Sequence, residues 1–186
     1  MGDPISSHER EANSAPKSTP RRFVVGLGTN LGDRLQLLHR ASVELDRFAR
    51  VEAVASLWES DAVGPPQDRY WNSALLMRGG ASAEEIVAAL LAIEHALGRV
   101  RTLRWGPRLI DLDLLWIDGE VSTDPRCEVP HPRLHERSFA LTPLLEVVPQ
   151  AVDPRTGLPF AETNTPALER VGAGVVEPLG WRLFAR

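Results

Sequence analysis

The sequence has 186 residues, of which 43% are apolar and 25% are charged, and its formal net charge is −4. These values are typical of one globular domain with a hydrophobic core, and they give no general reason to expect nucleic acid or a membrane as a partner. The single cysteine, Cys127, excludes an internal disulfide framework and a zinc site built from several thiolates. No apolar run approaches the ~20 residues of a spanning helix, and the first twenty residues lack the apolar core of a signal peptide. We therefore expect a cytoplasmic protein in a reducing compartment.

Three parts of the chain differ in composition. Residues 1–20 are polar and show no apolar period, so they are expected to form a disordered arm. Residues 21–150 carry the periodic apolar patterns, and they are predicted to form the main folded domain. Residues 151–186 are weakly patterned and are predicted to be a C-terminal extension packed on the same domain.

The first half of this main domain alternates strand and helix patterns. The apolar, β-branched run at residues 23–28 predicts a buried strand, and residues 31–50 have near-helical apolar spacing with Asn30 or Asp33 as the cap. Residues 51–58 predict a second strand that runs into a proline-containing loop.

The second half continues this alternation. Strands are predicted at residues 71–77 and 110–117, and helices from Ser82 to about Leu97 and from Glu136 to about Val148. The resulting βαββαβα order favours a ferredoxin-like α+β sandwich, of βαββαβ type, with helices on one face of an antiparallel sheet.

Two aspartates interrupt the fourth predicted strand. In a strand Asp111 and Asp113 point to the same face, where like charges disfavour joint ionisation unless a cation lies between them. Mg²⁺ binds carboxylate oxygens, waters and substrate phosphates, so the pair suits one or two Mg²⁺ ions. The alternative is a strand whose two acids face solvent opposite an apolar core side.

The segment before these aspartates favours the metal site. It carries four arginines, whose guanidinium groups match phosphate oxygens: Arg99, Arg101, Arg104 and Arg108. Trp105-Gly106-Pro107 within this run predicts a shaped loop that covers phosphates. Arg99 and Arg101 also follow the end of a helix, where complementing the helix dipole is the simpler role.

Two further segments could contact a ligand. At the entry of the last predicted helix lie His131, Arg133, His135 and Arg137, and a helix N-terminus favours an anion. The neighbouring prolines disfavour zinc binding by the two histidines. The spacing of the glycines after the first strand does not match a dinucleotide-binding loop, but they could form the floor of a pocket.

Residues far apart in the sequence could recognise a flat heterocycle. Asn72, at the start of a strand, could read the edge of a ring, and Tyr70 and Phe139 could stack on it. Both aromatic rings could equally belong to the core.

Four motifs, taken in order, resemble those of the 6-hydroxymethyl-7,8-dihydropterin pyrophosphokinase family of folate biosynthesis. They are Gly-x-Gly-Thr-Asn-Leu-Gly-Asp-Arg, Tyr-Trp-Asn, Arg-Trp-Gly-Pro-Arg-x-Ile-Asp-Leu-Asp-Leu-Leu, and Val-Pro-His-Pro-Arg-x-x-x-Arg-x-Phe-x-Leu-x-Pro-Leu, within about residues 23–150. The resemblance implies transfer of a pyrophosphoryl group from ATP to the pterin hydroxymethyl, with two Mg²⁺ ions and release of AMP. We also expect a monomer.

The resemblance also implies roles for individual residues. The metal ligands would be Asp111 and Asp113, and the catalytic residues Arg99, Arg101, Trp105 and Arg108. The positions that match ATP contacts are Arg99, Arg108, Leu114, Arg126, His131 and Arg137. The positions that match pterin contacts are Gly28, Ser60, Val63, Tyr70, Asn72, Trp105 and Phe139.

The sequence departs from the family pattern in two places, and two other functions compete. Ser60-Asp61-Ala62 stands where a Thr-Pro-like sequence is common, and Pro132 where an aromatic residue can follow the histidine.

A metal-dependent phosphodiesterase or nuclease would also use paired carboxylates, but its site usually gathers further acids or histidines. A non-catalytic nucleotide-binding module would bind ATP without forming AMP.

Overall fold

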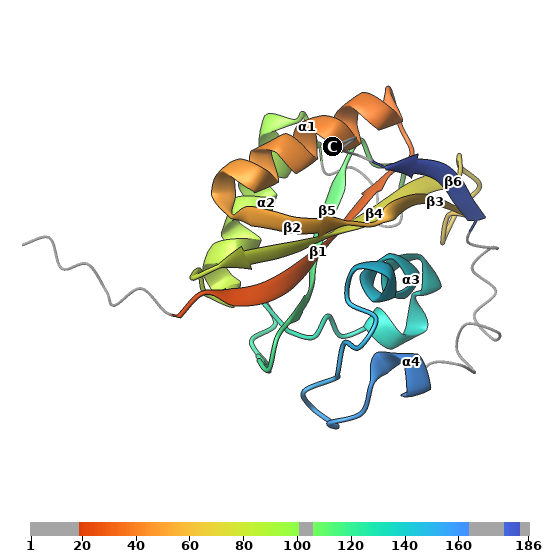
Figure 1. The fold of residues 1–186 in the computed structure, drawn as a ribbon. Coiled ribbons are helices and arrows are strands. Elements are labelled where there is room, and N and C mark those ends of the chain that lie inside the picture. The colour runs from red at the N-terminus through yellow and green to blue at the C-terminus, as the bar shows by residue number, and fades with distance from the viewer. Residues whose placement is uncertain (1–18, 101–105, 164–176, 183–186) are drawn as a thin grey trace, which may run out of the picture.

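The computed structural model describes residues 19–100 and 106–163, together with the backbone of residues 177–182. Its elements are β1 (Arg21–Thr29), α1 (Arg34–Phe48), β2 (Arg50–Val54), β3 (Ser56–Ser60), β4 (Tyr70–Gly79), α2 (Ala83–Ala96), β5 (Asp111–Ile117), a 3-10 turn (Leu134–Glu136), α3 (Ser138–Val147), α4 (Phe160–Thr163) and β6 (Glu177–Arg182) (Figure 1). Most of the predicted arm, and Arg101 and Trp105, lie outside the described residues.

The strands form one antiparallel sheet in the order β5-β1-β4-β3-β6. β2 also pairs with β4, so β2 and β3 together make a single neighbour of β4 that is interrupted at Ala55. The predicted strand at residues 51–58 is therefore two short strands. With α1 and α2 as the connections, the order β1-α1-β2/β3-β4-α2-β5 confirms the predicted ferredoxin-like α+β sandwich.

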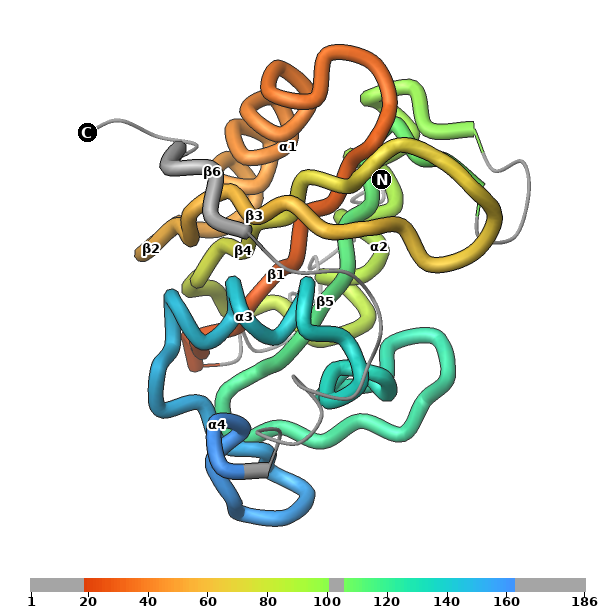
Figure 2. Tube along the Cα trace, turned by 90° about the vertical axis from the view of Figure 1, so that its right-hand side faces the viewer, coloured from red at the N-terminus to blue at the C-terminus, as the bar shows by residue number. Residues whose placement is uncertain are grey.

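Helices cover both faces of the sheet, and the prediction that they lie on one face was wrong. α1 and α2 lie on one side of the strands and α3 lies on the other (Figures 1 and 2). The reason is visible in β1, where Phe23 and Val25 join the core beneath α1 and α2, while Val24 between them joins the core beneath α3. A central strand that is apolar on both sides must be covered on both sides.

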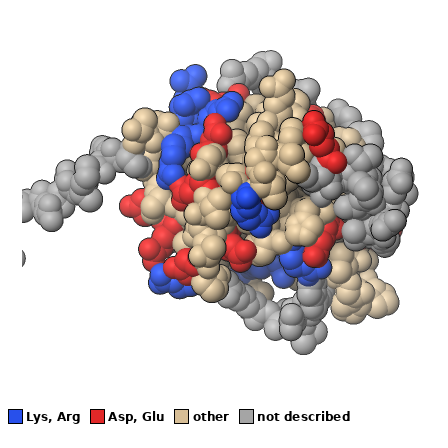
Figure 3. Space-filling view, turned by 90° about the horizontal axis from the view of Figure 1, so that it is seen from below, with Lys and Arg blue, Asp and Glu red and all other residues tan. Residues whose placement is uncertain are grey.

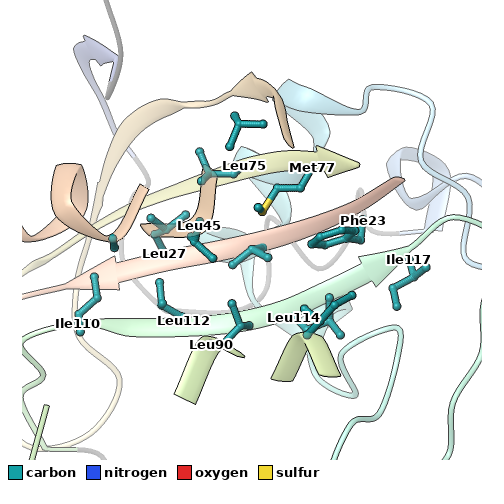
Figure 4. Packing of buried hydrophobic residues seen from close by; sticks show 14 of the residues in the cluster. Phe23, Leu27, Leu45, Leu75, Met77, Leu90, Ile110, Leu112, Leu114 and Ile117 are labelled. Atoms are coloured by element: carbon teal, nitrogen blue, oxygen red, sulfur yellow. The ribbon is translucent and has the colours of Figure 1, made fainter. Parts of the chain in front are cut away.

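The larger core lies between the sheet and the helices α1 and α2. Leu27, Leu75 and Met77 from the strands pack there with Leu45 of α1 and Leu90 of α2 (Figure 4). The smaller core joins α3 to β4 and β5 and also buries Ala151 and Phe160 of the C-terminal region.

Local hydrogen bonds explain where the helices begin. Asp33 caps α1 by accepting the Gln36 N–H at 3.1 Å, and Gly32 before it has a φ of 66°, so the helix starts after the predicted Leu31. The predicted capping box of α2 is present, with Ser82 and Glu85 each bonding the backbone of the other.

None of the described helices is long and apolar enough to cross a membrane. On the face seen from below, acidic and basic side chains are intermingled with uncharged surface (Figure 3).

Candidate active site

Two aspartates at the start of β5 face the side of the sheet that α3 covers. Asp111 lies opposite Gly28 and Asp113 opposite Gly26 on β1. A Cβ atom placed on Gly28 would come within 3.5 Å of the Asn72 Oδ1 and 3.8 Å of the Asp111 Cβ. Glycine at this position therefore leaves open space between the aspartates and β4, as expected for the floor of a pocket.

Two arginines neutralise Asp111. The Arg99 and Arg108 guanidinium groups approach the same oxygen, Asp111 Oδ1, at 2.7 and 2.5 Å. Arg99 also pairs with Glu94, a buried acid of α2, and Glu94 Oε1 accepts the Leu112 N–H at 2.7 Å. Burial raises the pKa of Glu94, and the Leu112 N–H and Arg99 oppose this shift. Arg99 is thus fixed between α2 and β5, which is more than the helix-dipole role requires.

The analysis of the sequence missed Glu94, although a signal was present. Ile86 and Leu90 are buried on one side of α2, and Glu94 follows at the same spacing of four residues. A charged residue on the buried side of a helix needs a partner.

Asp113 is less enclosed by cations than Asp111. Its side chain keeps 40% of its surface exposed, and the Arg137 guanidinium lies 3.7 Å from its Oδ2. Partial removal from water and, next, the negative charge of Asp111 raise the pKa of Asp113 to about 6, against the opposing effect of Arg137 and Arg108. A cation between the two carboxylates would relieve this repulsion.

A first cavity opens beside the aspartates on the α3 side of the sheet. Every described residue that was assigned to the pterin lines it: Gly28, Ser60, Val63, Tyr70, Asn72 and Phe139. Asn72 is buried and its Nδ2 donates to Ser60 Oγ at 2.9 Å. The Tyr70 hydroxyl donates to the carbonyl oxygen of Gly106 at 3.4 Å. Amide and hydroxyl groups from two strands thus converge on one apolar-walled space, which is typical of a site for a flat polar ring.

The second cavity runs between α2, β5 and the segment 125–132. Five of the six residues assigned to ATP line it: Arg99, Arg108, Leu114, Arg126 and His131. The sixth, Arg137, lines the first cavity. Arg126 is exposed and pairs with Asp124 at 2.7 Å, while Leu114 is largely core.

Three residues line both cavities, namely Arg108, Asp111 and Asp113. The aspartates therefore lie where the two spaces meet. A group bound in one cavity can reach a group bound in the other at this junction.

His131 is a neutral hydrogen-bond donor toward the second cavity. Burial and, next, the charge of Arg137 lower the pKa of His131 to about 4. His131 Nδ1 accepts the Arg133 N–H at 3.2 Å, so the proton of the neutral ring resides on Nε2. The ring can therefore donate to an anion without carrying a charge.

Asn30 joins two loops around the first cavity instead of capping α1. Its Oδ1 accepts the Arg108 N–H at 2.8 Å, and its Nδ2 donates to the Gln67 Oε1 and the Asp68 carbonyl oxygen at 3.0 Å each. The prediction left either Asn30 or Asp33 as the cap, and the structure selects Asp33.

The donor set at the junction fits Mg²⁺. Two carboxylates of one strand, with a raised pKa on Asp113, face space open to water and substrate, and Mg²⁺ commonly takes one or two carboxylates together with phosphate oxygens and waters. Among the described residues no group of three or more His, Cys, Asp or Glu could hold a metal.

Comparison with known proteins adds independent information. The family described as 7,8-dihydro-6-hydroxymethylpterin-pyrophosphokinase (HPPK) matches residues 24–149. The chain is 40% identical over 158 residues to a 2-amino-4-hydroxy-6-hydroxymethyldihydropteridine pyrophosphokinase of Synechocystis sp., which covers 84% of this chain and 79% of that protein. The Bacillus subtilis protein of the same name is 38% identical over 143 residues, with coverage of 75% and 84%.

The chain belongs to the HPPK family. A solved structure described as HPPK-DHPS in complex with substrates superposes with a TM-score of 0.62 at 10% identity, covering 81% of this chain and 44% of that one. The chain thus spans less than half of that longer protein, and the likeness shows the shared fold.

Family membership confirms the resemblance and the class of reaction, a pyrophosphokinase. Arg101 and Trp105, which the resemblance assigned to catalysis, lie outside the described residues. The other assigned residues gather around two adjoining cavities, although their roles remain predictions.

Proposed function

We propose that the chain transfers a pyrophosphoryl group from ATP to 6-hydroxymethyl-7,8-dihydropterin, with the pterin in the first cavity and ATP in the second. The observation that carries this assignment is the junction of the cavities at Asp111 and Asp113. A transfer between two substrates needs one shared space, and metal-binding groups belong where the phosphates lie.

The first cavity supports pterin binding by its shape and its polar groups. Tyr70 and Phe139 supply aromatic rings, and buried Asn72 supplies an amide beside Gly28. The missing side chain at Gly28 lets a flat ring approach the sheet. Ser60 orients the amide by accepting its N–H, which leaves Asn72 Oδ1 as an acceptor for ring donors.

The second cavity supports ATP binding through cations and neutral donors. Arg99 and Arg108 already hold a carboxylate oxygen and could extend to phosphate oxygens. His131 would donate from Nε2, Arg126 would reach the nucleotide from the exposed rim, and Leu114 would contact it from β5.

Asp111 and Asp113 would hold two Mg²⁺ ions together with phosphate oxygens. When bound, these ions supply positive charge that stabilises the transferring group and orients it. The chain itself contributes Arg99, Arg108 and Arg137, which lie around the carboxylates.

The reaction then needs positioning more than acid–base chemistry. The pterin hydroxyl oxygen bonds to the β-phosphorus while the bond from that phosphorus to the α-phosphate oxygen breaks, and AMP leaves. The hydroxyl proton passes to solvent, and we name no general base because the loose transition state demands little early proton removal. Arg101 and Trp105 are proposed, from the sequence, to belong to a loop that covers the phosphates.

The test is a direct analysis of products. ATP, Mg²⁺ and 6-hydroxymethyl-7,8-dihydropterin are mixed with the protein and followed by phosphorus NMR and chromatography. AMP together with a pyrophosphorylated pterin supports the proposal. Cleavage of DNA or RNA instead would favour a nuclease, and ATP binding without AMP would favour a non-catalytic module.

We also propose a localisation, an oligomeric state and a domain organisation from the sequence. The protein would act as a cytoplasmic monomer, with residues 1–20 as an arm and residues 151–186 as an extension of the catalytic domain at residues 21–150. Sedimentation of the full chain at several concentrations tests the monomer.

A further inference from the structure

The β3–β4 loop, residues 61–69, forms one wall of the pterin cavity and has a small ion-pair network at its base. Arg69 Nη1 donates to Glu59 Oε2 at 2.7 Å, and Arg69 Nε donates to Asp61 Oδ1 at 3.0 Å. One guanidinium at the end of the loop therefore binds both the C-terminal end of β3 and the first residue of the loop.

Arg69 is itself firmly attached to the body of the protein. Glu59, with 20% of its side chain exposed, also accepts the Trp71 Nε1–H at 3.1 Å. Arg34 of α1 donates to the Arg69 carbonyl oxygen at 3.1 Å, and its guanidinium lies 4.1 Å from the centre of the Trp71 ring. Contacts from α1, β3 and β4 thus fix the backbone from which the Arg69 side chain extends.

The two halves of the loop are held in different ways. Asn30 Nδ2 donates to the Asp68 carbonyl oxygen, which fastens the second half to the region near β1. The first four loop residues contain no proline, and two of them, Asp61 and Val63, line the cavity. The pair between Asp61 and Arg69 connects this half to the half that is already fastened.

We propose that Arg69 is a positioning residue for the pterin, acting through Asp61 to hold the first half of the loop against the cavity. The inference rests on the proposed function of that cavity. Arg69 and Asp61 keep 37% and 59% of their side-chain surfaces exposed, so salt screens their attraction. The affinity for the pterin is therefore salt-dependent, although the pterin itself carries no net charge.

The first experiment measures the steady-state KM and kcat for the pterin at saturating Mg²⁺ and ATP, in 50 and 500 mM KCl. In Arg69→Gln we expect KM to rise about two- to five-fold, the range of an exposed ion-pair network, with kcat little changed. Wild-type KM should rise with salt by a similar factor, and Arg69→Gln should lose this dependence. Arg69→Lys, which keeps one charge, should fall between the two.

A matched control removes an equally exposed pair elsewhere. Arg22 pairs with Asp118 at 2.9 Å near the start of β1, with 40% and 47% of the side chains exposed. Arg22→Gln should leave KM, kcat and the salt dependence at their wild-type values. An equal rise of KM in this variant would overturn a specific role for Arg69.

A double-mutant cycle then tests the route through Asp61. Because Asp61 lines the cavity, Asp61→Asn can raise KM by itself, but Arg69→Gln should add little in that background. Additive effects, or a fall in kcat at constant KM, would overturn the inference. If wild type forms AMP but Arg69→Gln matches it, only this inference fails; if wild type forms no pterin-dependent AMP, the proposed function fails.

Discussion

Gly28 of β1 and Asp111 of β5 lie directly opposite each other, and a Cβ on Gly28 would stand 3.8 Å from the Asp111 Cβ. The same added atom would stand 3.7 Å from the ring of Tyr70. A side chain added at the floor of the proposed pterin cavity would thus be in van der Waals contact with the first candidate metal ligand. A change at Gly28 therefore tests the cavity without removing a charge.

Gly28→Ala is expected to fold but to bind the pterin poorly. The new methyl group meets its neighbours at ordinary contact distances, yet it fills space that the ring requires. An overpacking cost of about 1–3 kcal/mol predicts a rise in pterin KM of about 5- to 150-fold, with little change for ATP. Kinetics and thermal unfolding measure both effects. Gly26→Ala should instead lower the melting temperature, because the new Cβ would lie only 3.0 Å from Leu115 Cδ1 in the core.

Asp113→Asn should separate activity from stability. Loss of a metal ligand is expected to lower AMP formation at least about a hundredfold. The pKa of Asp113 is raised to about 6 from 3.8, so its ionised form costs stability above that pH, and the amide removes this cost. At pH 7.5 the metal-free variant should have a free energy of unfolding higher than that of the metal-free wild type. The gain should be no more than about 1 kcal/mol, because water screens the part-exposed side chain.

The control for this prediction is Asp118→Asn, which removes an exposed acid paired with Arg22. It should keep wild-type turnover. Near-normal turnover in Asp113→Asn would contradict the metal assignment.

Mg²⁺ binding should weaken in mild acid. With its pKa raised to about 6, Asp113 is ionised at pH 8 and increasingly protonated below pH 6, and a cation must then displace the proton. Calorimetric titration of Mg²⁺ and ATP should give a constant affinity between pH 7 and 8 and a progressive loss below pH 6. An affinity that stays constant down to pH 5 would contradict the shift.

His131 should remain neutral over the same range. Its pKa is lowered to about 4, so the C2 proton resonance should not titrate between pH 8 and 5.5 in the folded protein. In the chain unfolded by urea the same resonance should titrate near the usual value of about 6.5. Nitrogen chemical shifts should place the ring proton on Nε2, and a protonated Nδ1 in the folded protein would refute the assignment.

Much of the fold could be predicted because the signals for it are local. The strand of Phe23, Val24 and Val25 and the capping box of Ser82 depend on residues next to one another in the chain. The sequence did not predict that α3 covers the second face of the sheet. This helix, which contributes Leu141 to the smaller core, follows all the predicted strands, and only packing decides which face it covers.

The candidate site was predicted unevenly for the same reason. Asp111 and Asp113 are two residues apart in one strand, so the pair could be recognised from local spacing. Distant residues such as Asn72 were assigned only through the family motifs. Glu94 and Arg69 escaped notice because their roles depend on neighbours brought close by the fold, namely the N–H of Leu112 for one and a loop carboxylate for the other. Sequence spacing alone does not contain such contacts.

The hydrogen bond from Leu112 to Glu94 has a second consequence, for assembly. β5 pairs with β1 on one side, and its outer side is an open sheet edge in the described strand order. Exposed edges can recruit a strand of another chain. Glu94 occupies the outward N–H of Leu112, and the His131 N–H donates to the outward carbonyl oxygen of Leu115 at 2.9 Å. Residues that line the proposed nucleotide cavity thus also shield this edge from intermolecular β-pairing, so loss of Glu94 is expected to promote aggregation.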